Sequence, residues 1–166
     1  RMELHANSLA ESLSRIYDGK FVPLHAPARV SSRNIRDELL KEDSLLPAIY
    51  LTQKLDIAVV GIGYPNEKSA IMATGYFKEN EIESLIDRKV AGELCMQFYD
   101  IYGDTAPYKD DNNVIGMDIS MLRSVPRSIG IAGGVEKLRA VRGAINGHYI
   151  NTLITDIECA EALISE

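Results

Sequence analysis

The stretch SIGIAGGVEKLRAVRGAINGHYINTLITD, residues 128–156, carries the clearest fold signal in the chain. It begins with a short apolar run that ends at Gly133 and Gly134, which is typical of a buried strand followed by a tight turn. Apolar residues then recur at spacings of three and four, which predicts one face of a helix. They are Leu138, Val141 and Ile145.

The second half of this stretch completes a strand–helix–strand unit. Gly147 lies where a helix stop is expected, and residues 149–154 return to an apolar run. We expect parallel strands with a right-handed crossover, and the glycine pair then lies at the end of the sheet where α/β folds bind ligands. Lys137 falls in the first helical turn, from which a lysine can contact an anion held at the helix N-terminus.

Composition predicts one domain of an ordinary soluble type. The chain has 166 residues, of which 46% are hydrophobic and 25% charged, and it contains no apolar run of the roughly 20 residues that a membrane helix needs. Because the net charge is −6, we do not expect this domain to bind nucleic acid by itself. No secretory leader is visible, so we expect a cytoplasmic protein with Cys95 and Cys159 as buried free thiols.

The remaining patterns predict buried strands that alternate with helices, as in a mainly parallel α/β sheet. A capping box at Ser8 and Glu11 is expected to start the first helix. Residues 101–113 favour a solvent-exposed hairpin or insertion over a calcium loop, because the spacing and closing glutamate of an EF-hand are missing. Helices are expected at residues 8–16, 32–40, 46–55, 79–89 and 157–164, the last capped by Asp156, and strands at 21–24, 56–63, 94–99 and 114–117.

Glycines at strand ends are the first candidate binding feature. Gly61 and Gly63, like the later glycine pair, would let backbone N–H groups approach a phosphate or a sugar closely. The alternative is that each glycine only makes a tight turn. GIGYPN lacks the third glycine of the dinucleotide fingerprint, so a nicotinamide cofactor is not expected.

Two charged side chains near these turns are candidate ligand contacts. Lys137 could contact an anion or a hydroxyl, and Glu93 could accept hydrogen bonds from sugar hydroxyls, although either could equally be a solvated surface residue. The three histidines are scattered and no pair has metal-ligand spacing. No nucleophile motif is present, so we expect no metal, no cofactor and no catalytic residue.

Four ordered blocks together resemble the effector-binding domain of SorC-type bacterial transcriptional regulators. They are LHAPARV at 24–30, DIAVVGIGYP at 56–65, AGELCMQFYDIYG at 91–103 and IAGGVEKLRAVRGAINGHYINTLITD at 131–156. The resemblance implies a Rossmann-like α/β domain with a mainly parallel sheet and helices on both faces, related to ribose-phosphate isomerases and glucosamine-phosphate deaminases. It implies one effector domain over residues 1–166 that binds a phosphorylated sugar or similar metabolite without turning it over.

The resemblance also implies site residues and partners. Lys137 matches the family lysine that contacts the effector, Glu93 matches the acidic residue that binds its hydroxyls, and Gly61 and Gly63 match the glycine turn that lines the cleft. His5 and Asn7 fall where the family also reaches the ligand. Such domains form homo-oligomers, and they contact DNA only through a helix-turn-helix domain that precedes them in the regulator.

Departures from the family pattern define the alternatives. The chain resembles the family from its second strand onward, so we expect the first βα unit and its phosphate loop to be missing and effector binding to be weak or absent. An isomerase or deaminase on the same fold is one alternative, with Glu93 and Lys137 as its base and polarising group. A structural or dimerisation fragment that binds no ligand is another.

Overall fold

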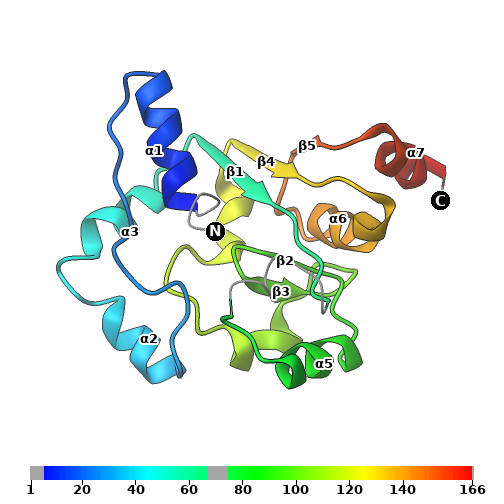
Figure 1. Cartoon of the computed structure of the whole chain (residues 1–166), viewed down its shortest axis with the longest axis horizontal. Helices are drawn as coiled ribbons and strands as arrows, with labels where there is room; N and C mark the ends of the chain where they lie inside the picture. Colours follow the sequence, from blue (N-terminus) through cyan, green and yellow to red (C-terminus); the bar gives the residue numbers. More distant parts are fainter. Residues whose placement is uncertain (1–5, 67–74, 166) are drawn as a thin grey trace.

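The computed structural model describes residues 6–66 and 75–165, and it forms an α/β fold (Figure 1). No helix within these two ranges is long and apolar enough to cross a membrane. In chain order the elements are α1 (Ala6–Ile16), α2 (Arg33–Leu39), α3 (Leu46–Thr52), β1 (Ile57–Gly61), α5 (Glu79–Asp87), β2 (Gly92–Leu94), β3 (Gln97–Tyr99), η2 (Ala106–Asp111), η3 (Ile119–Ser124), β4 (Arg127–Ile131), η4 (Val135–Lys137), α6 (Leu138–Asn146), β5 (Thr152–Ile154) and α7 (Ile157–Ser165).

Three parallel strands form the main sheet, in the order β1–β4–β5. Val59 is in register with Ile129, and Ile131 at the end of β4 is in register with Ile154 of β5. Strands β2 and β3 form a separate antiparallel hairpin. An isolated bridge between Gly63 and Glu93 joins this hairpin to the chain that leaves β1. The two sheets therefore meet at the carboxyl ends of the parallel strands.

The core lies between the main sheet, the hairpin and α6. Ala140, Val141 and Ala144 of α6 are fully buried against Leu94 and Tyr99 of the hairpin, in the same cluster as the sheet residues. Small residues permit this close approach, because an added Cβ at Gly92 would meet both Tyr99 and Ala140. A second apolar cluster joins α5 to the hairpin through a T-shaped pair of Phe77 and Phe98.

The strand–helix–strand prediction for residues 128–156 is confirmed, with a difference in its last strand. Strands β4 and β5 are parallel, α6 lies between them in the sequence, and Gly147 caps the helix. Strand β5 begins only at Thr152, because Tyr149 and Ile150 turn into the core instead. The hydroxyl of Tyr149 donates a hydrogen bond of 2.6 Å to the carbonyl of Gly103.

Several local predictions are wrong. Residues 21–24 and 114–117 form no strand; of these, only Val114 makes an isolated bridge, to Arg29. Of the hairpin or insertion predicted at residues 101–113, the hairpin is not formed, and the segment contains the 3-10 helix η2. Helix α1 starts at Ala6 rather than after Ser8, so Ser8 lies inside the helix and not at its cap. The Glu11 carboxylate accepts a hydrogen bond from Arg15 and makes no capping box.

The main sheet is covered unequally on its two faces. Ala58 and Ser128 point into the core, whereas the alternate residues of the strands point away from it, as the two-residue period of a strand requires. Four apolar side chains on this outer face are 44–57% exposed within the described part of the chain. They are Ile57, Val59, Ile131 and Ile154. Cys95 is also exposed, contrary to prediction, while Cys159 is buried and both are free thiols.

Candidate functional site

The candidate site begins where the chain leaves β1 and meets the hairpin. The N–H of Gly63 donates to the carbonyl of Glu93 at 3.0 Å, and the N–H of Glu93 donates to the carbonyl of Gly63 at 2.9 Å. This reciprocal pair fixes Glu93 beside the end of the parallel sheet. Sequence reasoning placed both residues at strand ends, but it did not show that the two ends bond to each other.

Gly63 and Gly61 differ in what they allow. A Cβ at Gly63 would overlap the Glu93 carboxylate, so only glycine leaves room for that side chain. A Cβ at Gly61, the last residue of β1, would meet nothing within 4 Å. Gly63 is therefore needed for the packing of Glu93, whereas no neighbouring atom requires glycine at position 61. That either glycine lines a ligand cleft remains a prediction.

Lys137 reaches the same glycine turn from the chain that follows the neighbouring strand β4. It ends η4, directly before α6, and its Nζ donates a hydrogen bond of 3.1 Å to the carbonyl of Ile62. Ile62 is buried and lies between the two glycines. A lysine has three donors, so this anchor leaves two N–H groups of Lys137 for a ligand.

The Glu93 carboxyl is held in a largely dry position. Burial raises its pKa to about 6, while the N–H of Met96 and the positive charge of Lys137 oppose this rise by favouring the carboxylate. Met96 donates its N–H to Oε2 at 2.9 Å. Among the described hydrogen bonds Oε1 accepts none, so this oxygen remains an acceptor for a hydroxyl group.

The turn that precedes Lys137 is held by Asp156. Oδ2 of Asp156 accepts the N–H of Gly134 at 2.5 Å, and Oδ1 accepts the N–H of Cys159 in α7 at 2.8 Å. These two backbone donors, Cys159 first, lower the pKa of the Asp156 carboxyl. The predicted helix cap is confirmed. Its bond to Gly134, which has a positive φ of 93°, was not predicted.

The predicted residues are therefore only partly brought together. Gly61, Gly63, Glu93 and Lys137 converge at the carboxyl end of β1, through Ile62 and the Gly63–Glu93 bridge. Asn7 lies on the exposed first turn of α1 and remains a prediction. His5 lies outside the described residues. Sequence reasoning missed the backbone groups of Ile62 and Met96, which carry no side-chain signature.

The chemistry of this arrangement suits a hydroxylated anion. A buried carboxylate accepts hydroxyl hydrogen bonds, and an anchored ammonium attracts a phosphate or carboxylate. In residues 6–66 and 75–165 no group of three His, Cys, Asp or Glu side chains could hold a metal ion. Glu93, Lys137 and the glycine turn make up the candidate site.

Comparisons with a family model and with curated proteins indicate the same family. A family model described as "Putative sugar-binding domain" matches residues 1–165. The chain is 33% identical over 138 residues to the sorbitol operon regulator of Klebsiella pneumoniae, covering 83% of this chain and 44% of that protein. It is 36% identical over 142 residues to the transcriptional regulator LsrR of Escherichia coli strain K12, covering 84% and 45% respectively.

A solved structure shows the same fold. The full-length sorbitol operon regulator SorC from Klebsiella pneumoniae superposes with a TM-score of 0.87 at 30% identity, over 99% of this chain and 53% of that chain. The present chain thus spans about half the length of the curated relatives it matches. Because the family match covers nearly every residue, the chain belongs to the family of sugar-binding domains found in SorC-type transcriptional regulators.

Proposed function

We propose that this chain is the effector-sensing domain of a SorC-type transcriptional regulator and that it binds a phosphorylated sugar or related metabolite. The observation that carries the proposal is the convergence of Glu93 and Lys137 on the turn around Ile62. Glu93 would accept hydrogen bonds from sugar hydroxyls, and Lys137 would contact the anionic group. Gly63 supports the site because it makes room for the carboxylate.

The proposed mechanism is a shift between two arrangements of the regulator. An effector can move such an equilibrium only if it binds one arrangement more tightly than the other. Glu93 and Lys137 stand on separate elements, β2 and η4, so a ligand that contacts both links the hairpin to α6. DNA would be bound by a helix-turn-helix domain outside this chain, since the net charge of −6 disfavours DNA contact by this domain.

We further propose that the regulator is a cytoplasmic homo-oligomer. Support for self-association comes from the outer face of the main sheet, on which four apolar side chains are 44–57% exposed in the described structure. The relatives reported above are transcriptional regulators, which supports a location where DNA is accessible.

Calorimetric titration with a panel of sugar phosphates tests the proposal, with the unphosphorylated sugars as comparison. Binding by this chain is expected to be weak, but phosphorylated sugars should bind measurably and more tightly than the unphosphorylated ones. Lys137→Met should weaken the binding by roughly tenfold or more, because it removes one charge-assisted contact. Arg139→Met is the matched control, since Arg139 is an exposed cation two residues away on α6. Equal binding by the Lys137→Met variant, or no binding by any phosphorylated sugar, would contradict the proposal.

The enzyme alternative receives less support. Isomerisation needs a base and a polarising group, and Glu93 with Lys137 could fill both roles. Asp156, however, is committed to the N–H groups of Gly134 and Cys159 and offers no second carboxylate to the site. The relatives are also named as regulators. Turnover of ribose or fructose phosphates in a coupled assay would reverse this judgement.

A further inference from the structure

A cavity borders β3, the hairpin strand that pairs with the strand carrying Glu93. Its volume is about 280 Å³, at the small end of the range of ligand pockets. Strand β3 supplies Gln97 and Phe98 to its wall, and the rest comes from α2, from η2 with its flanking residues, and from the start of η3 with the residue before it. None of the residues assigned to the Glu93–Lys137 site lines it.

The hairpin separates the two sites by its hydrogen-bonding pattern. Glu93 directs its N–H and C=O to Gly63, on the outer edge of β2. Phe98 is the residue opposite Glu93 in the hairpin. In an antiparallel pair such a residue turns its own N–H and C=O to the other side, so those of Phe98 face the edge of β3 that borders the cavity.

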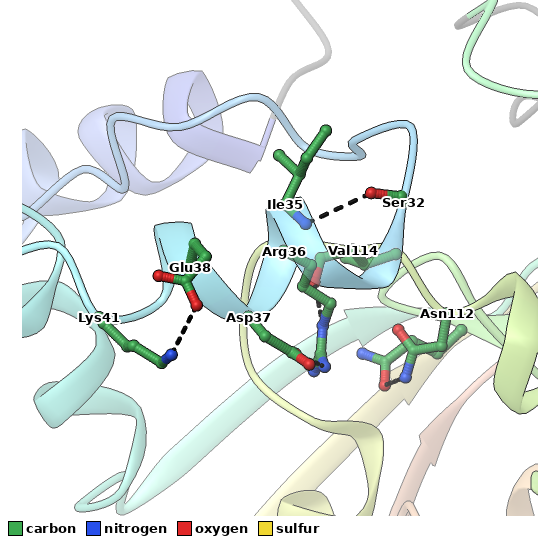
Figure 2. A network of polar contacts seen from close by, with 9 residues as sticks. Ser32, Ile35, Arg36, Asp37, Glu38, Lys41, Asn112 and Val114 are labelled. Carbon is green, nitrogen blue, oxygen red and sulfur yellow. Dashed lines mark hydrogen bonds and ion pairs between the residues drawn. The ribbon is translucent and has the colours of Figure 1, made fainter.

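Cationic side chains gather at this cavity from separate elements. Arg33 and Arg36 come from α2 and Lys109 comes from η2. Arg36 is anchored, because its Nε donates to the carbonyl of Val114 at 3.0 Å and it pairs with Asp37 at 3.1 Å (Figure 2). Within the described ranges the side chains of Arg33 and Lys109 have no hydrogen-bond or ion-pair partner.

An amide network behind the cations leaves one acceptor unused. Both polar atoms of the Gln97 side chain are bonded: its Nε2 donates to the carbonyl of Met117, and its Oε1 accepts from Asn112 and from the N–H of Ile119. Asn112 donates its Nδ2 to Gln97, and its buried Oδ1 has no hydrogen-bond partner among residues 6–66 and 75–165. Figure 2 shows Asn112 on the side of α2 from which Arg36 extends, and both residues line the cavity.

A buried acceptor without a partner costs free energy of about 1–3 kcal/mol unless a ligand or a water satisfies it. Asp118, which also lines the cavity, has its Oδ1 occupied by Ser120 and adds one more acceptor at the rim. The lining therefore combines cationic side chains with oxygen acceptors that can take a hydrogen bond. A ligand that matches it needs an anionic group and at least one N–H or O–H donor.

We propose that this cavity is a second small-molecule site, which binds a small hydroxylated anion such as a short-chain polyol phosphate. Arg33, Arg36 and Lys109 contact the anionic group, and Asn112 Oδ1 accepts a hydrogen bond from a hydroxyl. The small volume excludes large ligands, so the site takes a smaller molecule than a drug-sized effector. The proposal is independent of the Glu93–Lys137 site, because the two share no residue.

Nuclear magnetic resonance titration with glycerol 3-phosphate, and with inorganic phosphate and glycerol as separate probes, tests the proposal. Glycerol 3-phosphate should shift the amide signals of Asn112 and Ile119 saturably and more tightly than inorganic phosphate, and glycerol alone should not shift them. The double variant Arg33→Ala/Lys109→Ala should weaken this binding at least tenfold. Both residues are exposed, so the variant should keep its fold.

Matched variants separate this site from the effector site. Lys41→Ala removes a lysine from beyond the end of α2, where it pairs with Glu38 at 2.7 Å, and it should leave binding unchanged. Lys137→Met should also leave the Asn112 and Ile119 shifts unchanged, even if it abolishes sugar-phosphate binding. If the double variant binds as tightly as the parent, or if Lys137→Met removes the shifts at Asn112, the second site is disproved.

Discussion

Glu93 holds a charge in a place where burial disfavours it. Its pKa is raised to about 6 from an ordinary 4.5, so the folded protein holds this proton more tightly than the unfolded chain does. The Glu93 contribution to stability is therefore full below pH 4.5 and is lost as the pH rises through 6. At 1.36 kcal/mol for each pKa unit, the loss is on the order of 2 kcal/mol.

We predict that Glu93→Gln removes this loss. The free energy of unfolding of the variant should exceed that of the parent by about 2 kcal/mol at pH 8, and by far less at pH 4.5. Urea denaturation at both values gives the difference between the two proteins, in which other titrating groups cancel. Glu83→Gln, at an exposed position on α5, is the control. A constant difference across this range would show that burial does not dominate at Glu93.

Glu93 also shows which features of the site can be predicted from the sequence and which cannot. The sequence predicts Lys137 and Glu93 as ligand contacts, because charged side chains near strand ends, in the order typical of the family, indicate a ligand cleft. Their fixed positions depend on the carbonyl of Ile62 and the N–H of Met96, and every residue has such groups. A pattern of side chains cannot identify which of them will be used.

At the scale of elements, the hairpin was the least predictable part. Residues 94–99 look like one continuous β-prone run, but Cys95 and Met96 form a two-residue turn with φ values of 53° and 61°. Positive φ at both positions is typical of a type I′ turn, which prefers Asn–Gly. Cysteine and methionine give no turn signal, so the reversal was invisible in the sequence. The helices with an apolar stripe, such as α5 and α6, were predicted correctly.

We predict that the turn can be strengthened at Cys95. The side chain is exposed, so replacement changes little packing and mainly tests the left-handed backbone. Cys95→Asn should raise the free energy of unfolding by about 0.5–1 kcal/mol, because asparagine tolerates this region, and Cys95→Val should lower it by at least as much. Thermal and urea unfolding of the two variants give the comparison. The opposite order would mean that the turn is not type I′ in solution.

Gly103 lies in the loop after the hairpin and packs against the end of α6. It has a φ of 79°, and a Cβ at this position would overlap the backbone of Gly147. We predict that Gly103→Ala lowers the free energy of unfolding by several kcal/mol, since it adds a steric clash to backbone strain. Gly75→Ala is the matched control, because Gly75 has a similar φ of 72° and open space around it. That control should cost only about 1 kcal/mol. Equal losses in urea unfolding would show that the clash is relieved by movement of α6.

At the scale of the whole molecule, the order of strands and helices was predictable and the covering of their faces was not. The apolar run at β1 predicts a buried strand, and the stripe in α1 predicts an apolar helix face. Neither pattern says which other element will cover such a face. In the described structure α1 buries none of its residues, and Leu9, Leu13 and Ile16 stay 50–73% exposed. The outer face of the main sheet is open in the same way, although the α/β class is confirmed.

We predict that this open sheet face drives self-association of the chain. Val59 is 57% exposed on β1, at the edge of the sheet, where both its side chain and the unpaired strand edge can meet another copy. Sedimentation velocity over a wide concentration range should show oligomers of the parent that dissociate on dilution. Val59→Lys should shift the equilibrium to monomer, because the lysine charge would have to be desolvated in the interface. Val22→Lys, at an exposed position outside the sheet, should leave the oligomers intact. A parent protein that stays monomeric at every concentration would refute this role of the face, and circular dichroism of both variants would show that the fold is retained.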